Sequence, residues 1–237
     1  MSLAACGRYG FATGDASSDP AHDGAADARV TDSAVGDTKL LDAATDVALG
    51  PCTPLAISDN FDDGTANNEW TVIANNPVNT TETGGELQVA LASAGGAHYG
   101  GYDSVAPVDL REHCMFVTFI DEPTNEALVE MTFQVRVAAG AVGFVYHQGM
   151  LEAFVNPGTF MSLGAAPYDA GQDQVLRIRE DNGTMTWETS PDGMTFNVFT
   201  SRATPLDVSA STVVLEAGTY GSAPSPGIAK YDNFDVP

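Results

Sequence analysis

Short apolar runs follow one another from about Leu55 to the end of the chain, and this feature most constrains the fold. The runs are rich in Val, Thr, Phe and Tyr, whereas Gly, Pro, Asn and Asp separate them. No stretch shows a helical period that competes with these runs. The pattern predicts an all-β, antiparallel two-sheet sandwich over residues 55–237. The predicted strands are 86–91, 115–120, 127–137, 142–147, 152–155, 175–180, 184–189, 196–200, 212–217 and 228–236.

The run from Glu126 to Val137 shows the strand period most clearly. Its alternate apolar positions are Ala127, Val129, Met131, Phe133, Val135 and Val137, and the polar positions between them include Glu126, Glu130, Gln134 and Arg136. Successive side chains of a strand point to opposite faces of a sheet. We therefore expect the apolar set to face the core and the polar set to meet water.

A hairpin is predicted at residues 181–184, which read Asp-Asn-Gly-Thr. A two-residue turn needs positive φ at both central residues, and Asn-Gly meets that need. This turn places Ile178 opposite Trp187 and Arg177 opposite Glu188. Trp187 then shares a face with Ile178, so we expect it to pack in the core rather than to serve as a stacking platform for sugars.

The charge of the chain excludes several classes of partner. Of its 237 residues, 32 are Asp or Glu and 9 are Lys or Arg, which gives a formal net charge of -23. Such a charge repels a phosphate backbone and an anionic membrane surface, so nucleic acid is not an expected partner. No apolar run approaches the about 20 residues that cross a bilayer.

Residues 7–54 are predicted to form a disordered linker rich in Ala and Asp. Between residues 12 and 50 there is no aromatic residue and no Ile. Such a segment buries too little apolar surface to offset the entropy of ordering. Its acids recur every four or five residues, which favours an extended chain that repels itself. An acidic tail that binds a ligand is the alternative.

The beginning of the chain, Leu3-Ala4-Ala5-Cys6-Gly7, resembles the lipobox of bacterial lipoproteins. The resemblance implies that residues 1–6 are the remnant of a signal peptide and that Cys6 carries a lipid. We then expect the chain at the bacterial cell envelope, as an outer membrane lipoprotein, or outside the cell, with the lipid as its one contact with a membrane. The alternative is an unpaired cysteine in a disordered end.

Cys52 and Cys114 are the two cysteines that remain. Export would allow them to form a disulfide. Cys52 lies where the linker composition ends, and Cys114 opens an apolar run. The bridge would therefore attach the start of the domain to a core strand. With few thiols and no clustered His, a site of the zinc type is not expected.

The tetrapeptide Asp-Asn-Phe-Asp occurs at residues 59–62 and again at residues 232–235. If the first and last strands are neighbours, Phe61 and Phe234 can fill the core while the acids gather outside it. Gathered carboxylates need a cation, hydrogen-bond donors or protonation, and calcium prefers oxygen ligands. The predicted calcium ligands are Asp59, Asp62 and Asp232.

Three segments carry a resemblance to a known family. Residues 59–64 followed by Trp70, residues 187–193 and residues 231–236 resemble the concanavalin A-like lectin/glucanase superfamily, in particular the laminin-G-like jelly rolls of bacterial surface lipoproteins. The resemblance spans about residues 57–236. It implies a jelly roll with one convex and one concave sheet, sugar binding on the concave face or its loops, and in many members a calcium ion.

Members of this superfamily that resemble laminarinases carry Glu-x-Asp-x-Glu or Glu-x-Asp-x-x-Glu on a concave strand. Here Glu126 and Glu130 supply the outer pair, but Leu128 occupies the place of the Asp. Residues four apart on a strand lie ~13 Å apart, which is too far for two carboxyl groups of a retaining hydrolase. The sequence therefore predicts no catalytic residues and a chain that is not an enzyme.

The predicted function is that of a non-catalytic module that binds a glycan or an extracellular protein. The predicted ligand-binding residues are Glu130, Gln134, Arg136 and Tyr146, which offer hydrogen bonds and an aromatic ring. The glycine-rich residues 95–102 are interpreted as a flexible loop whose tyrosines contact a ligand. A hydrolase of the laminarinase type and a purely structural interaction module are the alternatives.

Overall fold

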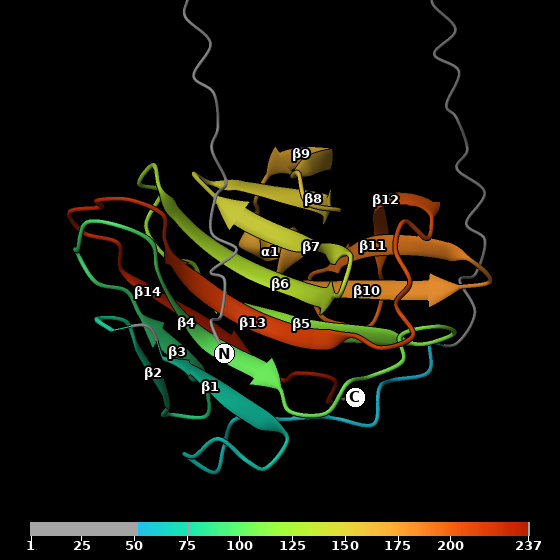
Figure 1. Cartoon of the computed structure of the whole chain (residues 1–237), viewed down its shortest axis with the longest axis horizontal. Coiled ribbons are helices and arrows are strands. Elements are labelled where there is room, and N and C mark those ends of the chain that lie inside the picture. Colours follow the sequence, from blue (N-terminus) through green and yellow to red (C-terminus); the bar gives the residue numbers. More distant parts are fainter. Residues whose placement is uncertain (1–51, 75, 237) are drawn as a thin grey trace, which may run out of the picture. The chain divides into compact units, whose positions relative to one another are not determined.

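The computed structural model describes residues 52–74 and 76–236, and they form two antiparallel seven-stranded sheets (Figure 1). Sheet I contains, in spatial order, β1 (Trp70–Ala74), β4 (His98–Ser104), β13 (Thr212–Thr219), β6 (Val129–Val137), β7 (Gly140–His147), β8 (Met150–Asn156) and β9 (Met161–Pro167). Sheet II contains β12 (Asn197–Ala203), β11 (Thr184–Ser190), β10 (Val175–Asp181), β5 (Cys114–Asp121), β14 (Ile228–Asp232), β3 (Leu87–Ala90) and β2 (Asn79–Glu82). The predicted all-β sandwich is confirmed.

Helical structure is minor in the described part of the chain. The short helix α1 (Ala170–Asp173) begins after Asp169, whose carboxylate accepts a hydrogen bond from the backbone N–H of Gly171. Within residues 52–74 and 76–236, no helix has the length and apolarity needed to cross a membrane. Cys6 and nearly all of the predicted linker lie outside the described residues, so lipidation, linker disorder and envelope location stay predictions.

The core lies between the two sheets, and polar groups of large aromatic residues tie the sheets together. Trp187 of sheet II is fully buried, and its Nε1 donates to the carbonyl oxygen of Gly143 in sheet I at 2.9 Å. Tyr231 of sheet II is also fully buried, and its hydroxyl lies 2.6 Å from the carbonyl oxygen of Glu216 in sheet I. The expected core position of Trp187 is confirmed.

The hairpin between β10 and β11 has the register that its turn predicts. Asp181 pairs with Thr184, which places Ile178 opposite Trp187 and Arg177 opposite Glu188. The two turn residues, at positions 182 and 183, have φ of 51° and 76°. Local turn chemistry thus sets the pairing of these two strands.

The glycine-rich residues 95–102 are not a flexible loop, which corrects the interpretation from sequence. Most of them belong to β4, which lies between β1 and β13. A Cβ on Gly100 would come within 2.5 Å of Val78 Cγ1. A Cβ on Gly101, whose φ is +141°, would come within 1.9 Å of the carbonyl oxygen of Leu215. The glycines therefore permit close packing of a strand rather than mobility. Strands β1, β2 and β9 were also absent from the prediction.

The two copies of the repeated tetrapeptide lie side by side, as expected. The backbone N–H of Asp59 donates to the carbonyl oxygen of Phe234 at 2.9 Å, and the reverse bond is 2.8 Å long. Phe61 and Phe234 are fully buried. The acids do not all gather outside the core, however, because Asp59 and Asp235 are buried. Buried backbone donors near them provide the hydrogen bonds that make this possible.

A disulfide joins Cys52 to Cys114, the first residue of β5, and confirms the predicted pairing. Their Cα atoms are 5.8 Å apart, and the backbone N–H of Cys114 donates to the carbonyl oxygen of Thr53 at 3.0 Å. The start of the described chain is therefore attached to an inner strand of sheet II both covalently and by the backbone.

Reduction of this disulfide is expected to destabilise the domain. The bridge joins residues 62 positions apart and so lowers the conformational entropy of the unfolded chain. The expected loss in the free energy of unfolding is about 2–4 kcal/mol. Urea unfolding with and without dithiothreitol measures it. In the Cys52→Ser variant, dithiothreitol should cause no further change. A wild-type midpoint that does not respond to reduction would contradict the expectation.

Candidate functional site

The outward face of sheet I, which points away from sheet II, carries the candidate site. Strand β6 lies at the middle of this sheet. Its residues Met131, Phe133 and Val135 are fully buried against sheet II. By strand alternation its outward positions are Glu130, Thr132, Gln134 and Arg136.

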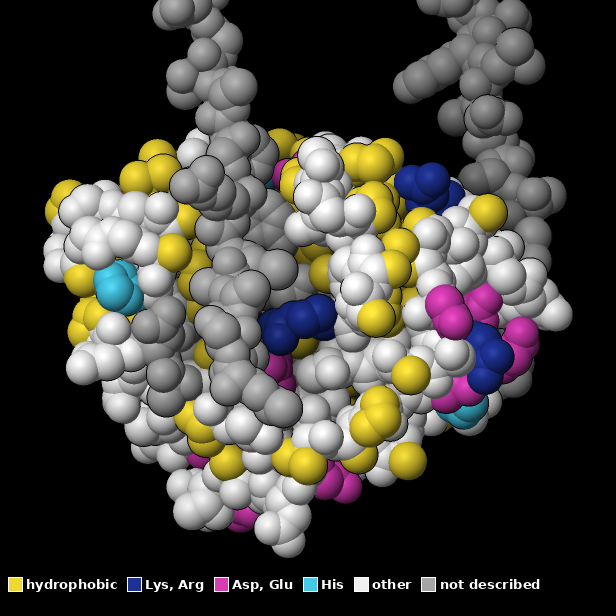
Figure 2. All heavy atoms as spheres, viewed as in Figure 1, with side chains coloured by type: hydrophobic (Ala, Val, Ile, Leu, Met, Phe, Trp, Pro, Cys, Tyr) yellow, Lys and Arg dark blue, Asp and Glu magenta, His cyan; other side chains and the backbone are white. Residues whose placement is uncertain are grey.

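Four acids from four strands lie on this outward face. We call them the carboxylate cluster: Asp103 of β4, Glu130 of β6, Glu152 of β8 and Glu216 of β13. In each strand the residues on either side belong mainly to the core, which directs the acids outward. Figure 2 shows dark-blue basic atoms beside magenta acidic atoms near the middle of the molecule, in the orientation of Figure 1.

Register brings Glu130 and Glu216 together at the centre of the face. Glu130 pairs with Gly218 of β13, and Glu216 pairs with Thr132 of β6, so the two acids are diagonal neighbours on adjacent strands. Diagonal neighbours lie about 7–8 Å apart at the backbone. Two glutamate side chains at that spacing can bring their carboxyl groups to the about 5–9 Å that glycoside hydrolysis requires.

Glu130 is buried and receives a hydrogen bond. The residue is 4% exposed, and the hydroxyl of Tyr99 donates a hydrogen bond to Glu130 Oε1 at 2.7 Å. Burial raises the pKa of Glu130, whereas the Tyr99 hydrogen bond and the nearby His147 lower it and so favour the ionised form. The net effect is a pKa above the usual value for a glutamate, and the Tyr99 hydroxyl holds the carboxyl group in place.

Glu216 has a different environment. Burial, together with the charges of Glu130 and Asp103, raises its pKa to about 7, although the Arg136 charge opposes the rise. Arg136 Nη2 lies 3.7 Å from Glu216 Oε2, and Arg136 Nη1 lies 3.2 Å from Asp103 Oδ2. Glu216 therefore keeps its proton to a much higher pH than an ordinary glutamate.

The neighbouring strands add a contact between a histidine and a glutamate, and an apolar surface. His147 Nε2 lies 3.0 Å from Glu152 Oε2, and His147 is the register partner of Glu130. Further toward β9 lies an apolar cluster of Ala141, Val145, Phe154 and Phe160. The rings of Phe154 and Phe160 are stacked with centroids 5.2 Å apart. Charged groups and aromatic rings on one face are the groups that recognise sugars.

Three of the four predicted ligand-binding residues share this face, and one does not. Glu130, Gln134 and Arg136 lie along β6 at alternate positions. Tyr146 is the register partner of Met131, is 4% exposed and points into the core, where its ring centroid is 5.4 Å from that of Tyr168. The sequence around Tyr146 is apolar on both faces of β7, so alternation did not reveal its direction.

The acidic partner of Glu130 is Glu216, not Glu126. Strand β6 begins at Val129, and Leu128 before it has φ of 86°, which interrupts the strand. Glu126 Oε1 accepts a hydrogen bond from the backbone N–H of Ser225 at 3.0 Å. The interpretation of Glu126 and Glu130 as two carboxylates of one strand is therefore wrong.

Sequence reasoning missed several residues of the site. They are Asp103, Glu152 and Glu216. Glu216 follows Val213, Val214 and Leu215 in a predicted strand, and this lone acid among apolar residues was a usable signal. Asp103 gave none, because its strand was not predicted. Tyr99 was predicted to contact a ligand, but from a flexible loop rather than from a strand.

The predicted calcium ligands are held by hydrogen bonds to the protein. Asp59 accepts from the backbone N–H of Phe61 and, through Oδ2, from Asn67 Nδ2 and Trp70 Nε1, each at 2.8 Å. Asp62 accepts from Asn60, and Asp232 accepts from Asn233. In the part of the chain that the structure describes, no three His, Cys, Asp or Glu residues are grouped to hold a metal ion. Calcium binding stays a prediction.

Comparisons with known proteins support the fold. The sequence matches no protein-family model and no curated protein. A Bacillus licheniformis β-glucanase has a similar structure, with 12% identity, 78% of this chain and 98% of that chain covered, and a TM-score of 0.56. LamAcat from Zobellia galactanivorans has 11% identity, coverage of 77% and 95%, and a TM-score of 0.52. A lichenase from a mouse hindgut metagenome has 8% identity, coverage of 75% and 96%, and a TM-score of 0.53.

These solved structures confirm the predicted jelly-roll fold, which is the fold that the resemblance to the concanavalin A-like superfamily implies. The prediction that the chain is not an enzyme is contradicted, because a β-glucanase and a lichenase share its fold along nearly their whole length. The prediction was wrong because it considered only a pair of acids within one strand. The two central carboxyl groups come from two strands, β6 and β13.

Proposed function

We propose that this protein is a glycoside hydrolase that cleaves a polysaccharide on the outward face of sheet I. The observation that carries the proposal is the pair Glu130 and Glu216, which lie diagonally on adjacent central strands in different environments. Hydrolysis of a glycosidic bond needs one protonated and one ionised carboxyl group. The β-glucanase and the lichenase that share the fold support the same reaction class.

Glu216 acts as the general acid. Its raised pKa keeps it protonated near neutral pH, and it donates that proton to the glycosidic oxygen as the bond to the anomeric carbon breaks. Glu130 faces the positive charge that develops on that carbon, and water completes the reaction. The configuration of the released sugar shows whether Glu130 bonds to the anomeric carbon or activates the water.

The proposal is tested by incubating the full chain with soluble glucans, mannans, galactans and xylans and measuring the release of reducing ends. We expect release from at least one of them, and release about 100-fold slower or more from the same substrate by the Glu216→Gln variant. Equal release by the wild type and this variant would point to a contaminating enzyme and would overturn the proposal.

The pH dependence of hydrolysis follows from the same two residues. Because the proton on Glu216 is needed, the rate should fall as pH rises through about 7. Glu130 must be ionised, so the rate should also fall as pH is lowered. Because the pKa of Glu130 is raised, this acid limit should lie at a higher pH than the pKa of an ordinary glutamate. Profiles of kcat/KM against pH measure both limits. An alkaline limit that persists unchanged in the Glu216→Gln variant would show that another group supplies the proton.

A further inference from the structure

Gln134 is a buried polar residue on the outward face of sheet I that the proposed reaction leaves unused. It is 5% exposed, and its Oε1 accepts no hydrogen bond from any residue within 52–74 or 76–236. A buried acceptor without a donor destabilises the protein that carries it. The residues around Gln134 show why its Oε1 has no hydrogen-bond donor.

The strands on both sides cannot supply a donor from their side chains. Gln134 pairs with Val214 of β13 and with Gly143 of β7, and neither side chain has a polar atom. Gly143 admits no replacement, because an added Cβ would lie 2.4 Å from Gln134 Cβ. Arg136, two positions along β6, directs its guanidinium to Asp103 and Glu216. The amide oxygen is thus left for a donor from outside the protein.

Gln134 also lies at a position next to the carboxylate pair. Since Glu216 is opposite Thr132 and Val214 is opposite Gln134, Glu216 and Gln134 are diagonal neighbours across β13 and β6. A polysaccharide with its scissile bond at Glu130 and Glu216 would place an adjoining sugar unit over Gln134. The hydroxyl groups of a neutral sugar are donors of the kind that this oxygen lacks.

We propose that Gln134 determines specificity by accepting a hydrogen bond from one hydroxyl group of the sugar unit next to the scissile bond. The proposal rests on the proposed hydrolase function for the position of that unit. A site built to bond one hydroxyl disfavours sugars that lack it or carry it in the other configuration, because the buried acceptor then stays unpaired.

The test compares Gln134→Leu with wild type, and Gln88→Leu is the matched control. Gln88 lies on β3 of sheet II and donates to Thr83 and Glu86, so the control makes the same chemical change away from the site. The full chains are assayed on glucan, mannan, galactan and xylan for kcat and KM. Their binding is measured by affinity electrophoresis in gels containing each polysaccharide, in the Glu216→Gln background, in which slow hydrolysis leaves the polysaccharide largely intact.

We expect Gln134→Leu to raise KM on the preferred polysaccharide about 10-fold or more and to change kcat less. The differences in kcat/KM among the four polysaccharides should therefore become smaller. Its melting temperature should be equal to or above that of wild type, because leucine removes an unpaired buried acceptor. This combination distinguishes lost recognition from lost folding. The Gln88→Leu chain should keep the wild-type preference.

Each other outcome is decisive. Unchanged preference and unchanged retardation in Gln134→Leu would overturn the role of Gln134 and leave the hydrolase proposal standing. Retardation that depends on Gln134 without any hydrolysis would reject the hydrolase and keep Gln134 as a sugar-binding residue. If no polysaccharide is cleaved or retards the chain, both proposals are wrong.

Discussion

Replacement of Glu216 or Glu130 by Gln is expected to lower kcat by a factor of about 10²–10⁴, because each variant removes one of the two groups that transfer a proton or stabilise charge. Glutamine keeps the shape of the side chain but can neither donate a carboxylic proton nor carry the negative charge. Initial rates of reducing-end release on the preferred polysaccharide measure the effect.

Glu126→Gln is the matched control for these variants. Glu126 precedes the same strand but bonds to the backbone of Ser225 rather than facing the cluster, so its replacement should leave kcat unchanged. The sequence motif alone would place Glu126 in the catalytic pair. A loss in Glu126→Gln as large as in Glu130→Gln would therefore contradict the site described above.

The stability of Glu216→Gln separates lost chemistry from lost folding. A carboxyl group whose pKa is raised in the folded state binds its proton more tightly there than in the unfolded chain. Its stabilising effect is therefore complete at low pH and is lost as pH rises through the folded pKa of about 7. Glutamine has no such proton to lose, so above pH 7 the variant should melt at or above the wild-type temperature.

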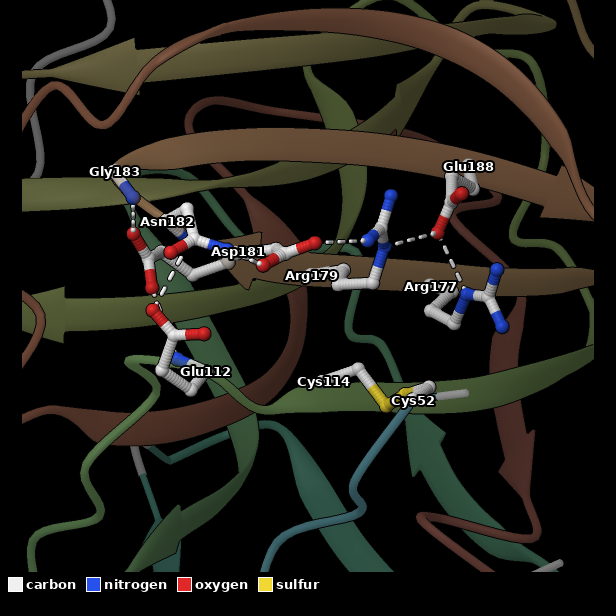
Figure 3. Close-up of polar contacts among 10 residues, drawn as sticks. Cys52, Glu112, Cys114, Arg177, Arg179, Asp181, Asn182, Gly183 and Glu188 are labelled. Atoms are coloured by element: carbon white, nitrogen blue, oxygen red, sulfur yellow. Dashed lines mark hydrogen bonds and ion pairs between the residues drawn. A yellow bond between two sulfur atoms is a disulfide. The ribbon is translucent and has the colours of Figure 1, made fainter. Parts of the chain in front are cut away.

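Replacement of Glu188 by Ala is expected to destabilise the domain by about 3–5 kcal/mol. Glu188 lies on the outward face of sheet II and is fully buried. Its Oε2 is 2.6 Å from Arg177 Nε and 3.7 Å from Arg179 Nε. Figure 3 shows the Glu188 carboxylate facing both guanidinium groups. Alanine would leave two largely buried guanidinium groups with one carboxylate, Asp181, which is half exposed and pairs with Arg179. Urea unfolding monitored by tryptophan fluorescence measures the loss.

Asp109→Ala is the control for this prediction. Asp109 Oδ2 lies 2.6 Å from Arg111 Nη2, the same distance as in the Glu188–Arg177 pair, but both side chains are exposed. Water screens such a pair, so its removal should leave the unfolding midpoint unchanged. If the two variants shift the midpoint equally, burial is not what makes the Glu188 pair important.

Local patterns in the sequence predicted the parts of the site that depend on one strand. The period of two placed Glu130, Gln134 and Arg136 on one face, because β6 is apolar on the other face alone. The same rule failed for Tyr146, since β7 is apolar on both faces. It also failed for Tyr99, because glycines that serve close packing in β4 look the same in a sequence as glycines that serve a loop.

The sequence by itself determined the all-β class, the turn and register of β10 with β11, and the cysteine pair, because these follow from composition, from turn chemistry and from the small number of cysteines. Only the tertiary structure decided that β13 lies beside β6 and that Glu216 is the partner of Glu130. These strands are far apart in the chain. Their order in the sheet follows from how the whole core packs, and no short stretch of sequence contains that information.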